Sequence, residues 1–456
     1  MIGFDLSEVA DLLHGQLHGP DAFFSRVGTD TRNLQAGELF VAIRGANFDG
    51  HDFLRKAAAK GAAGALVDRD VEAVLPLVRV EDALQGLGEL AAAWRERSVA
   101  TVIGITGSNG KTTLKEMCAA ILGQAAKVLA TRGNLNNDIG MPLTLSRLQD
   151  EPFAVIEMGA NHAGEIRYLS NICRPDVAVL NNAGRAHLEG FGSLDGVAHA
   201  KAEIIEGLRE GGTFVFNADD RYAGLWRQLA DGRKQLTFGV RERADITSAG
   251  DSYRIEWGEQ GFTAAFTVST PLEEFELSLQ LAGEHNRMNA LAAIAACHAV
   301  GGSPAQMQAG LAELRPVAGR LAPVQTDSGA RLIDDSYNAN PDSVIAALGV
   351  LRAAPGRRTL VLGDLGELGA EQEQLHKELG MHAAEAGVER LLSCGQLSRH
   401  ASEAFAGEAR HFESREALID YLGSSLDKQD SVLVKGSRSS AMDQVVRALR
   451  TGEAAC

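Results

Sequence analysis

A short apolar run, a glycine-rich turn and the start of a helix follow one another in 101-TVIGITGSNGKTTLKEM-117. Residues 101–106 have the length and apolar character of a buried strand, and apolar residues recur at helical spacing after Lys111. A strand that turns directly into a helix opens a β-α-β unit, so this stretch predicts a parallel sheet covered by helices. The residues expected on the buried face of the helix are Leu114, Met117, Cys118, Ile121 and Leu122.

The same alternation continues downstream. Further strands are expected at FAVIE (153–157), DVAVLN (176–181) and TFVFN (213–217), each followed by helical sequence. Residues 236–281 instead alternate apolar and polar positions, which favours antiparallel strands. Beyond that region, RLIDD, RTLVLGD, RLLSC and SVLVKGS restart the strand–helix rhythm, which ends near residue 437.

A chain of 456 residues is too long for one hydrophobic core, which implies several domains. The pattern predicts an α/β protein with a small mixed domain at 1–82, a central domain with a doubly wound parallel sheet at 83–313, and a Rossmann-like domain at 314–456. In the first, the apolar run 39-LFVAI-43 lies between glycine-containing turns.

Net charge, apolar runs and cysteine spacing exclude several classes of protein. A formal net charge of −16 argues against nucleic acid as a bulk partner, because such binding depends on clustered Lys and Arg. No secretory signal or membrane-spanning run is evident, and we expect a cytoplasmic monomer without membrane contact. Five scattered cysteines without C-x-x-C spacing are expected to be reduced thiols. They are Cys118, Cys173, Cys297, Cys394 and Cys456.

The glycine-rich turn before Lys111 has the chemistry of an anion site. Gly107 and Gly110 allow a tight turn that points successive N–H groups at an anion, and the following helix adds the positive end of its dipole. Lys111 reaches the outer phosphates of a nucleoside triphosphate, and Thr112 offers a hydroxyl to Mg²⁺. The usual spacing of this loop requires Gly where the chain has Ile105, and a turn without ligand is the alternative.

Three further residues are candidates for the chemistry. Glu157 ends a buried strand, where ligands of doubly wound sheets gather, and Mg²⁺ or a salt bridge would offset the cost of burying its carboxylate. His187 follows a strand and Lys201 lies in a helix. Taken alone, His187 could equally be a packing or surface residue, and Lys201 could equally be a solvated surface residue.

T-G-S-N-G-K-T-T at 106–113, with its altered spacing, resembles the nucleotide loop of the Mur ligase family. The resemblance extends to 131-TRGNLNNDIGMPLTL-145, to 283-GEHNRMNALAA-293 and to 334-DDSYNANPDS-343. It implies ATP-dependent amide ligation in peptidoglycan precursor synthesis, through an acyl phosphate, with two Mg²⁺ ions and a carbamylated Lys201. The catalytic residues it implies are Glu157, His187, Lys111 and Lys201.

The resemblance also assigns binding residues. For ATP it implies Gly107, Ser108, Asn109, Gly110, Lys111, Thr112, Thr113, Asn289, Arg320 and Asp335, with Asn289 near adenine, Asp335 on the ribose and Arg320 on the γ-phosphate. For the metals it implies Thr112, Glu157, His187 and carbamylated Lys201. For the uridine-diphosphate substrate it implies Thr31, Arg32, Gly45, Asn134, Asn136 and Asn137.

Two segments indicate which member of the family is resembled. The stretches 361-VLGDLGELGAEQEQLHKELG-380 and 434-VKGSR-438 resemble the D-alanyl-D-alanine-adding ligases, and the D-N-P-R and K-G-H-E segments of diaminopimelate-adding ligases do not occur. The implied substrates are therefore UDP-N-acetylmuramoyl-tripeptide and D-alanyl-D-alanine. The implied amine-site residues are Tyr337, Asn338, Asn340, Lys435, Ser437 and Arg438.

Two alternatives stay open. Another amide ligase of the same fold, of the diaminopimelate-adding or folylpolyglutamate type, would carry the same nucleotide loop. A nucleotide-dependent switch that hydrolyses ATP slowly needs only residues 101–123. For Lys435 and Arg438, the alternative to an amine site is a solvated helix start.

Overall fold

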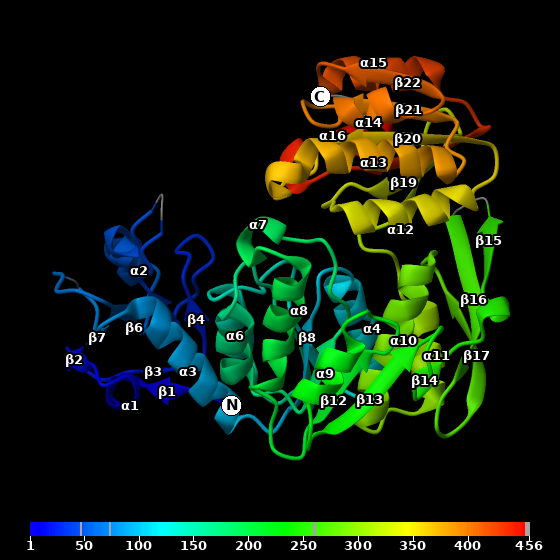
Figure 1. The fold of residues 1–456 in the computed structure, drawn as a ribbon. Coiled ribbons are helices and arrows are strands. Elements are labelled where there is room, and N and C mark those ends of the chain that lie inside the picture. The colour runs from blue at the N-terminus through cyan, green and yellow to red at the C-terminus, as the bar shows by residue number, and fades with distance from the viewer. Residues whose placement is uncertain (46–47, 73, 259–260, 452–456) are drawn as a thin grey trace.

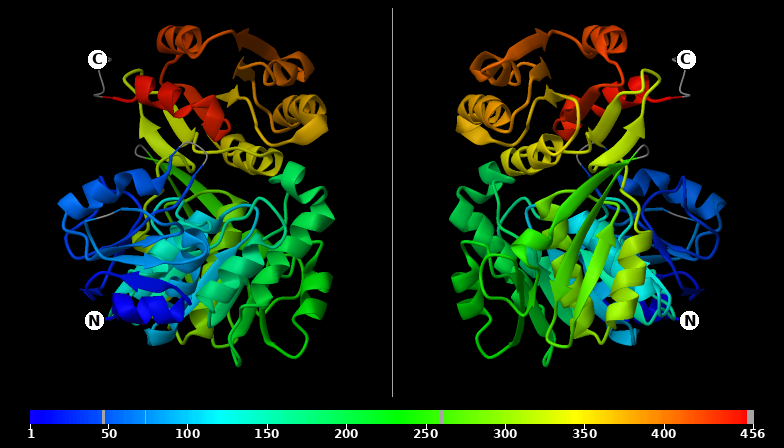
Figure 2. Two further views of the ribbon diagram at one scale, coloured as in Figure 1. Left: turned by 90° about the vertical axis from the view of Figure 1, so that its left-hand side faces the viewer. Right: turned by 90° about the vertical axis from the view of Figure 1, so that its right-hand side faces the viewer.

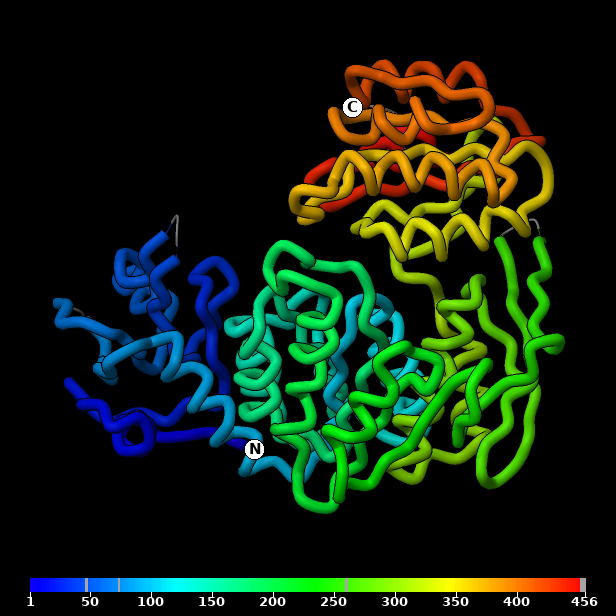
Figure 3. The backbone as a smooth tube through the Cα atoms, in the orientation of Figure 1, coloured from blue at the N-terminus to red at the C-terminus, as the bar shows by residue number. Residues whose placement is uncertain are grey.

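The computed structural model describes residues 1–45, 48–72, 74–258 and 261–451, so Cys456 lies outside the described residues. Among these residues, strands form a two-stranded, a five-stranded, a ten-stranded and a six-stranded sheet. Figure 1 shows the last of these, with its helices, above the large middle sheet, and the N-terminal elements beside it. The chain passes through these parts in sequence order, as the tube in Figure 3 shows.

The N-terminal part carries the two smaller sheets. Phe4 and Phe24 meet in an antiparallel pair, and β4, β5, β6 and β7 run parallel, with β2 antiparallel at the edge. The strands are β1 (Phe4–Asp5), β2 (Gln16–His18), β3 (Phe23–Phe24), β4 (Val27–Gly28), β5 (Leu39–Val41), β6 (Gly64–Val67) and β7 (Leu77–Arg79). The helical segments are α1 (Leu6–Leu12), η1 (Gly50–Phe53) and α2 (Leu54–Ala59).

The middle sheet has the order β15-β16-β14-β13-β12-β11-β8-β10-β9, and β17 pairs with β16. The strands are β8 (Thr101–Thr106), β9 (Val128–Ala130), β10 (Phe153–Glu157), β11 (Val177–Leu180), β12 (Thr213–Asn217), β13 (Lys234–Gly239), β14 (Ile246–Thr247), β15 (Arg254–Gly258), β16 (Gly261–Ser269) and β17 (Glu274–Leu279). Its first seven strands in sequence pair in parallel.

Helices cover this sheet on both faces (Figure 2). The helix after β8 buries the expected apolar stripe, because Leu114, Met117 and Cys118 are fully enclosed. The helical segments of this part are α3 (Ala83–Arg97), α4 (Lys111–Gly123), α5 (Gly140–Leu145), α6 (Glu165–Cys173), α7 (Leu188–Phe191), α8 (Leu194–Ala202), η2 (Glu203–Ile205), α9 (Ala223–Leu229), η3 (Gly250–Ser252), α10 (Glu284–Ala299) and α11 (Pro304–Glu313).

The C-terminal sheet has the order β18-β19-β23-β20-β21-β22 and is parallel except for β18. Its strands are β18 (Ala322–Gln325), β19 (Arg331–Asp335), β20 (Arg357–Gly363), β21 (Arg390–Cys394), β22 (Glu408–Phe412) and β23 (Asp430–Lys435). Its helical segments are α12 (Pro341–Arg352), η4 (Gly369–Glu371), α13 (Gln372–Glu385), α14 (Arg399–Ala404), α15 (Arg415–Ser425), η5 (Arg438–Ser440) and α16 (Asp443–Leu449).

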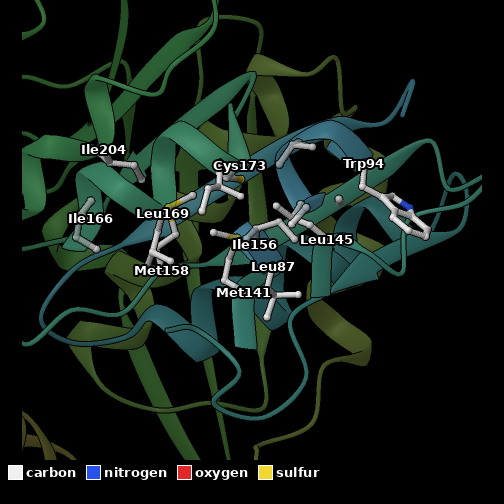
Figure 4. Packing of buried hydrophobic residues seen from close by; sticks show 14 of the residues in the cluster. Leu87, Trp94, Met141, Leu145, Ile156, Met158, Ile166, Leu169, Cys173 and Ile204 are labelled. Atoms are coloured by element: carbon white, nitrogen blue, oxygen red, sulfur yellow. The ribbon is translucent and has the colours of Figure 1, made fainter. Parts of the chain in front are cut away.

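Hydrophobic cores cross both junctions between these parts. One cluster joins Phe4 and Trp94 to Leu145 of α5 and Ile156 of β10, and Figure 4 shows Trp94 and Leu87 of α3 beside Met141 and Leu145. At the other junction, the β15–β16 hairpin reaches up to the C-terminal elements (Figure 1). There Phe262 is buried in the C-terminal cluster, with Trp257 packed against it.

The sequence pattern predicted most of these strands. The runs 101–106, 153–157 and 213–217 are confirmed as β8, β10 and β12, and the antiparallel pattern is confirmed for β15–β17. The antiparallel expectation is wrong for residues 236–239, because β13 pairs in parallel with β12. Cys118, Cys173, Cys297 and Cys394 are free and buried. No helix in the described ranges is both long and apolar enough to cross a membrane.

Candidate active site

The loop between β8 and α4 is shaped by two glycines with positive φ, Gly107 at 150° and Gly110 at 80°. A side chain at Gly110 would collide with Asn289, since a Cβ there would lie 2.3 Å from Asn289 Oδ1. Asn181 supports the loop from the end of β11, donating through Nδ2 to Asn109 O (3.0 Å) and to Asn289 Oδ1 (2.8 Å). The backbone therefore needs glycine here on both conformational and steric grounds.

Lys111 begins α4 and folds back over this loop. Its Nζ donates to Gly107 O at 2.7 Å. Burial lowers the pKa of Lys111, Glu157 opposes that shift, and Arg320 of the C-terminal part lowers the pKa further. Two cations thus approach the same loop from the two sides of the cavity, which suits a ligand carrying several negative charges.

Glu157 lies at the carboxyl end of β10, level with Ile105 of β8, and only 2% of its surface is exposed. Its carboxylate accepts from Thr112 Oγ1 at 2.9 Å and from Asn136 Nδ2 at 2.8 Å. Sequence reasoning assigned both Thr112 and Glu157 to Mg²⁺, and in the structure the two side chains form a hydrogen bond. Among the described residues no cluster of three or more His, Cys, Asp and Glu could hold a metal ion.

The segment after β11 holds the loop in place. Asn182 Oδ1 accepts from Asn109 N at 2.9 Å, and Ser108 Oγ accepts from Gly184 N at 2.9 Å. Sequence reasoning assigned no role to Asn181 or Asn182. The available signal was their position directly after the strand that neighbours β8, where a parallel sheet gathers polar side chains at its carboxyl edge.

His187 and Lys201 lie near this edge. His187 has a positive φ of 54°, and its Nδ1 lies 2.5 Å from Glu367 Oε2 of the C-terminal part. Burial lowers the pKa of His187; Glu367 raises it, and Lys111 and Lys201 lower it. Lys201 is 1% exposed, and its Nζ donates to Ala160 O at 3.3 Å. Burial, assisted by Lys111, lowers the pKa of Lys201 to about 7.

The C-terminal wall is organised by a buried ion pair at the ends of two adjacent strands. Asp335 ends β19 opposite Lys435 of β23, and Lys435 Nζ lies 2.5 Å from Asp335 Oδ2. Lys435 also donates to Asn338 O at 3.1 Å, and Asp335 Oδ1 accepts from Leu321 N at 3.2 Å. Burial raises the pKa of Asp335, and Lys435 opposes that shift. Lys435 is only 2% exposed, so the alternative that it lies at a solvated helix start is wrong.

Two arginines on this wall lie near one ring. The guanidinium carbon of Arg320 is 4.4 Å from the Tyr337 ring centroid, and that of Arg438 is 5.6 Å from it. Ser437, beside Arg438, is 5% exposed and donates through Oγ to Asp364 O at 2.6 Å.

Contacts between the two walls involve the N-terminus of α12. Asn340 accepts from Ser343 N through Oδ1, which caps the helix, and donates from Nδ2 to Asn109 Oδ1 of the loop at 2.7 Å. Asp342 accepts from the backbone N of Arg185 at 2.6 Å and from its Nε at 2.8 Å. Sequence reasoning missed Arg185 and Asp342, whose contact joins residues 157 positions apart.

The N-terminal turn of α10 lies between the walls. Asn289 is 4% exposed, and both polar atoms of its side chain are engaged, with Nδ2 donating to Asn286 Oδ1 at 3.2 Å. One turn earlier, the Nδ1 atom of His285 is buried and has no hydrogen-bond partner within the described chain. Burial lowers the pKa of His285 to about 4, and Lys435 contributes to that shift.

These elements surround one cavity of about 1020 Å³ between the middle and C-terminal parts. Nearly all of the predicted ATP, metal and amine residues line it, including Lys111, Glu157 and Arg438. Gly107 and Lys201 are not among the described lining residues, although Ala160, which Lys201 contacts, is. Of the residues predicted for the uridine-diphosphate substrate, those lining it are Asn134, Asn136 and Asn137.

The other residues predicted for that substrate lie in the N-terminal part, outside the described lining of this cavity. Thr31 is buried, and Arg32 is exposed and pairs with Asp30 at 2.7 Å. Gly45 N donates to Phe48 O at 2.8 Å. A ligand that touches both groups must therefore extend from the N-terminal part to the middle sheet.

Comparison with protein families gives three matches along the chain. Residues 24–95 match "Mur ligase family, catalytic domain", residues 105–297 match "Mur ligase middle domain", and residues 319–438 match "Mur ligase, glutamate ligase domain". The middle match contains the loop, Glu157, His187 and Lys201. The C-terminal match contains Arg320, Tyr337 and Arg438.

Individual relatives match over nearly their full length. The UDP-N-acetylmuramoyl-tripeptide–D-alanyl-D-alanine ligase of Escherichia coli K12 is 46% identical over 453 residues, which cover 99% of each chain. A crystal structure of MurF from Acinetobacter baumannii superposes with a TM-score of 0.91 at 35% identity, covering 98% of this chain and 99% of that one. MurF from Thermotoga maritima, solved in complex with ADP, has a TM-score of 0.84 at 28% identity and covers 93% and 96%.

Proposed function

The chain belongs to the Mur ligase family, and from this premise we propose that it joins D-alanyl-D-alanine to UDP-N-acetylmuramoyl-tripeptide, at the expense of ATP, in peptidoglycan precursor synthesis. The observation that carries the proposal is the 46% identity to a ligase of that name across 99% of both chains. The diaminopimelate-adding and folylpolyglutamate alternatives, and an ATPase switch, lack comparable support. The cytoplasmic location, the monomeric state and the exact domain boundaries stay predictions.

The cavity suits a reaction that joins two anionic substrates through a phosphorylated intermediate. The γ-phosphoryl group of ATP passes to the terminal carboxylate of the tripeptide, the dipeptide amine attacks the resulting acyl phosphate, and the tetrahedral intermediate expels phosphate. The main task of the protein is to align reactants and to offset repulsion among their charges. Lys111 and Arg320 are suited to this task because both are cations that line the cavity from different walls, and Arg320 lies close enough to Lys111 to lower its pKa.

ATP is expected to lie along the loop. The N–H groups of residues 110–113 at the start of α4 are expected to receive its phosphates, with Lys111 on the outer ones, because the N–H groups of Ser108 and Asn109 already donate to Asn182. We assign the γ-phosphate to Arg320. If Asp335 contacts the ribose as predicted, its carboxylate must accept hydrogen bonds from the sugar hydroxyls while it remains paired with Lys435. Asn289 already bonds to Asn181, which supports a role beneath the loop in addition to the predicted adenine contact.

The residues present fit magnesium. Glu157 is a buried carboxylate bonded to a hydroxyl and an amide, and oxygen donors of this kind are the ligands that Mg²⁺ prefers. Thr112 and Glu157 would hold one ion, and His187 with a carbamylated Lys201 a second. Bound Mg²⁺ would neutralise phosphate charge during phosphoryl transfer.

Carbamylation of Lys201 is chemically favoured by its surroundings. A pKa of about 7 leaves much of its amine uncharged at neutral pH, and only the uncharged amine attacks carbon dioxide. The neutral amine forms an N–C bond as one C=O π bond of carbon dioxide opens, and one proton is released, which converts a neutral amine into an anion near His187. Loss of activity in Lys201→Ala, with partial rescue by a short carboxylic acid such as acetate, would support the role. A fully active Lys201→Ala variant would exclude it.

The remaining substrates are assigned to the two ends of the site. The uridine-diphosphate part is expected near Thr31, Arg32 and Gly45, and its peptide end near the asparagines of 134–137. The dipeptide is expected at the C-terminal wall, where Arg438 can grip its free carboxylate with two parallel hydrogen bonds. Tyr337, Asn338, Asn340, Lys435 and Ser437 would shape that subsite.

One assay tests the function. Purified protein is incubated with ATP, Mg²⁺ and UDP-N-acetylmuramoyl-tripeptide, and phosphate release is measured with D-alanyl-D-alanine, glutamate, diaminopimelate or no amine. We expect release with the dipeptide alone, together with a product whose mass equals tripeptide plus dipeptide less water. Release with another amine would indicate a different ligase, and release without acceptor or amine would indicate a switch.

A further inference from the structure

Tyr337 lies close to both arginines that the proposed reaction assigns to negatively charged groups, Arg320 for the γ-phosphate and Arg438 for the dipeptide carboxylate. Its ring lies within cation–π range of Arg320 and of Arg438, so the two guanidinium carbons are no farther apart than the sum of 4.4 and 5.6 Å. Neither guanidinium forms an ion pair with a carboxylate among the described residues. All three side chains line the cavity.

The backbone fixes the geometry around this ring. Tyr337 N donates to Gly319 O at 3.1 Å, and a Cβ on Gly319 would lie 2.9 Å from that of Tyr337, so the two loops touch directly. Gly319 N donates to Asp334 Oδ2 at 2.9 Å. On the other side, Arg438 N donates to Asn338 Oδ1 at 3.3 Å. The segments that carry both arginines are thus anchored to the chain on either side of Tyr337.

We propose that Tyr337 is a positioning residue that orients Arg320 toward the phosphate of ATP and Arg438 toward the carboxylate of the dipeptide, and thereby couples the two binding events. This inference rests on the proposed function. Two adjacent guanidinium groups repel each other, and the negative face of an aromatic ring offsets that repulsion without neutralising either charge. An anion that binds one arginine then fixes the orientation of the Tyr337 ring, and the ring in turn orients the other arginine.

Replacement of the ring tests the coupling. Tyr337→Leu should raise the KM for ATP and the KM for D-alanyl-D-alanine, each about three- to tenfold, because a cation–π contact contributes about that much to the affinity. The KM for UDP-N-acetylmuramoyl-tripeptide should stay within about twofold, since its proposed site does not include the ring. Tyr337→Phe keeps the ring and should therefore raise both KM values less than Tyr337→Leu does.

A matched control exists in the same domain but away from the cavity. Tyr421 of α15 also has two arginines near its ring, Arg410 at 4.6 Å and Arg390 at 5.9 Å, and it is not among the described residues of the cavity. Tyr421→Leu should change thermal stability without changing any KM. If Tyr337→Leu moves all three KM values, one only, or none, the proposal is wrong.

A graded experiment avoids dependence on folding of the leucine variant. Phenylalanine analogues with increasing numbers of fluorine atoms, placed at position 337, weaken the negative face of the ring while nearly keeping its size. Both KM values should rise together along the series. A flat series would overturn the proposal even if the ligase reaction itself proceeds, whereas failure of the original protein to make product would concern the proposed function instead.

Discussion

On the middle-domain wall of the cavity, Lys111 donates a hydrogen bond to Gly107 O, and Glu157 accepts hydrogen bonds from two neighbouring side chains of the same domain. On the C-terminal wall, the guanidinium groups of Arg320 and Arg438 lie near the Tyr337 ring, and within the described part of the chain they form no ion pair. The first arrangement fixes charges before a ligand arrives. The second leaves charges adjustable, so we expect substitutions on the first wall to abolish the reaction and those on the second to shift affinity.

The largest effect is expected for Lys111→Ala. Removal of an ammonium aimed at the phosphates should lower kcat/KM by about a thousandfold, as for loss of one preorganised donor to developing charge. The measurement is phosphate release at saturating dipeptide, with circular dichroism to check folding. Lys127→Ala, at an exposed lysine of the same domain, is the control and should retain normal activity. Near-normal rates for Lys111→Ala would contradict the fixed-charge view of this wall.

The next effect concerns the stability of the C-terminal wall. Lys435→Met leaves the Asp335 carboxylate, whose side chain is only 13% exposed, without its ion-pair partner and should lower the free energy of unfolding by about 3 kcal/mol. Lys435→Met combined with Asp335→Asn should recover part of that loss, because the uncompensated charge is removed. Chemical denaturation of both variants measures the difference. Equal stability of the single variant and the original protein would mean that the pair is not the organising contact.

A smaller and more selective effect is expected for Arg438→Ala. The KM for D-alanyl-D-alanine should rise about tenfold, whereas the KM for ATP should change about threefold or less. Steady-state kinetics with each substrate varied in turn distinguishes the two. Arg410→Ala, next to Tyr421, serves as a control without contact to the cavity. Equal shifts in both KM values would remove Arg438 from the dipeptide site.

The smallest effect is a pH dependence that belongs to neither wall. Because the pKa of His285 is about 4 in the folded state and 6.5 ordinarily, the unfolded chain takes up a proton first as the pH falls. The free energy of unfolding should therefore decrease from about pH 6.5 toward pH 4, by about 0.8 kcal/mol already at pH 6. Thermal melts of His285→Gln should show a shallower decrease, and those of His18→Gln should match the original protein. Identical slopes for all three would contradict the assignment.

The sequence predicted the strands of both parallel sheets well for a physical reason. Strands buried on both faces are short, continuous apolar runs, and 331–335 and 390–394 are confirmed as β19 and β21 to the residue. The parallel pairing of β13 was missed because its sequence alternates apolar and polar residues. That alternation is equally typical of an antiparallel strand with one face exposed to solvent. For such a strand, the neighbouring strands determine the pairing direction more than its own sequence pattern does.

For the candidate site, the loop and Glu157 could be located because glycine spacing and a strand end are local signals. The contacts of Lys435 with Asp335, and of Asp342 with Arg185, join residues 100 and 157 positions apart and leave no local signal. Lys435 was assigned to the dipeptide from its motif alone. Its burial with Asp335 indicates that it also maintains the wall, while its predicted role stays a prediction.

The cores that cross both junctions have a consequence for unfolding. Trp94 belongs to the cluster that reaches the middle sheet, and Phe262 belongs to that of the C-terminal sheet. Separation of either part would expose these rings to water, at a cost of about 2 kcal/mol for each large side chain. Melting of one part therefore weakens the next, so the three parts should lose structure in one cooperative calorimetric transition, and the protein should resist proteases at its domain connections until that transition begins.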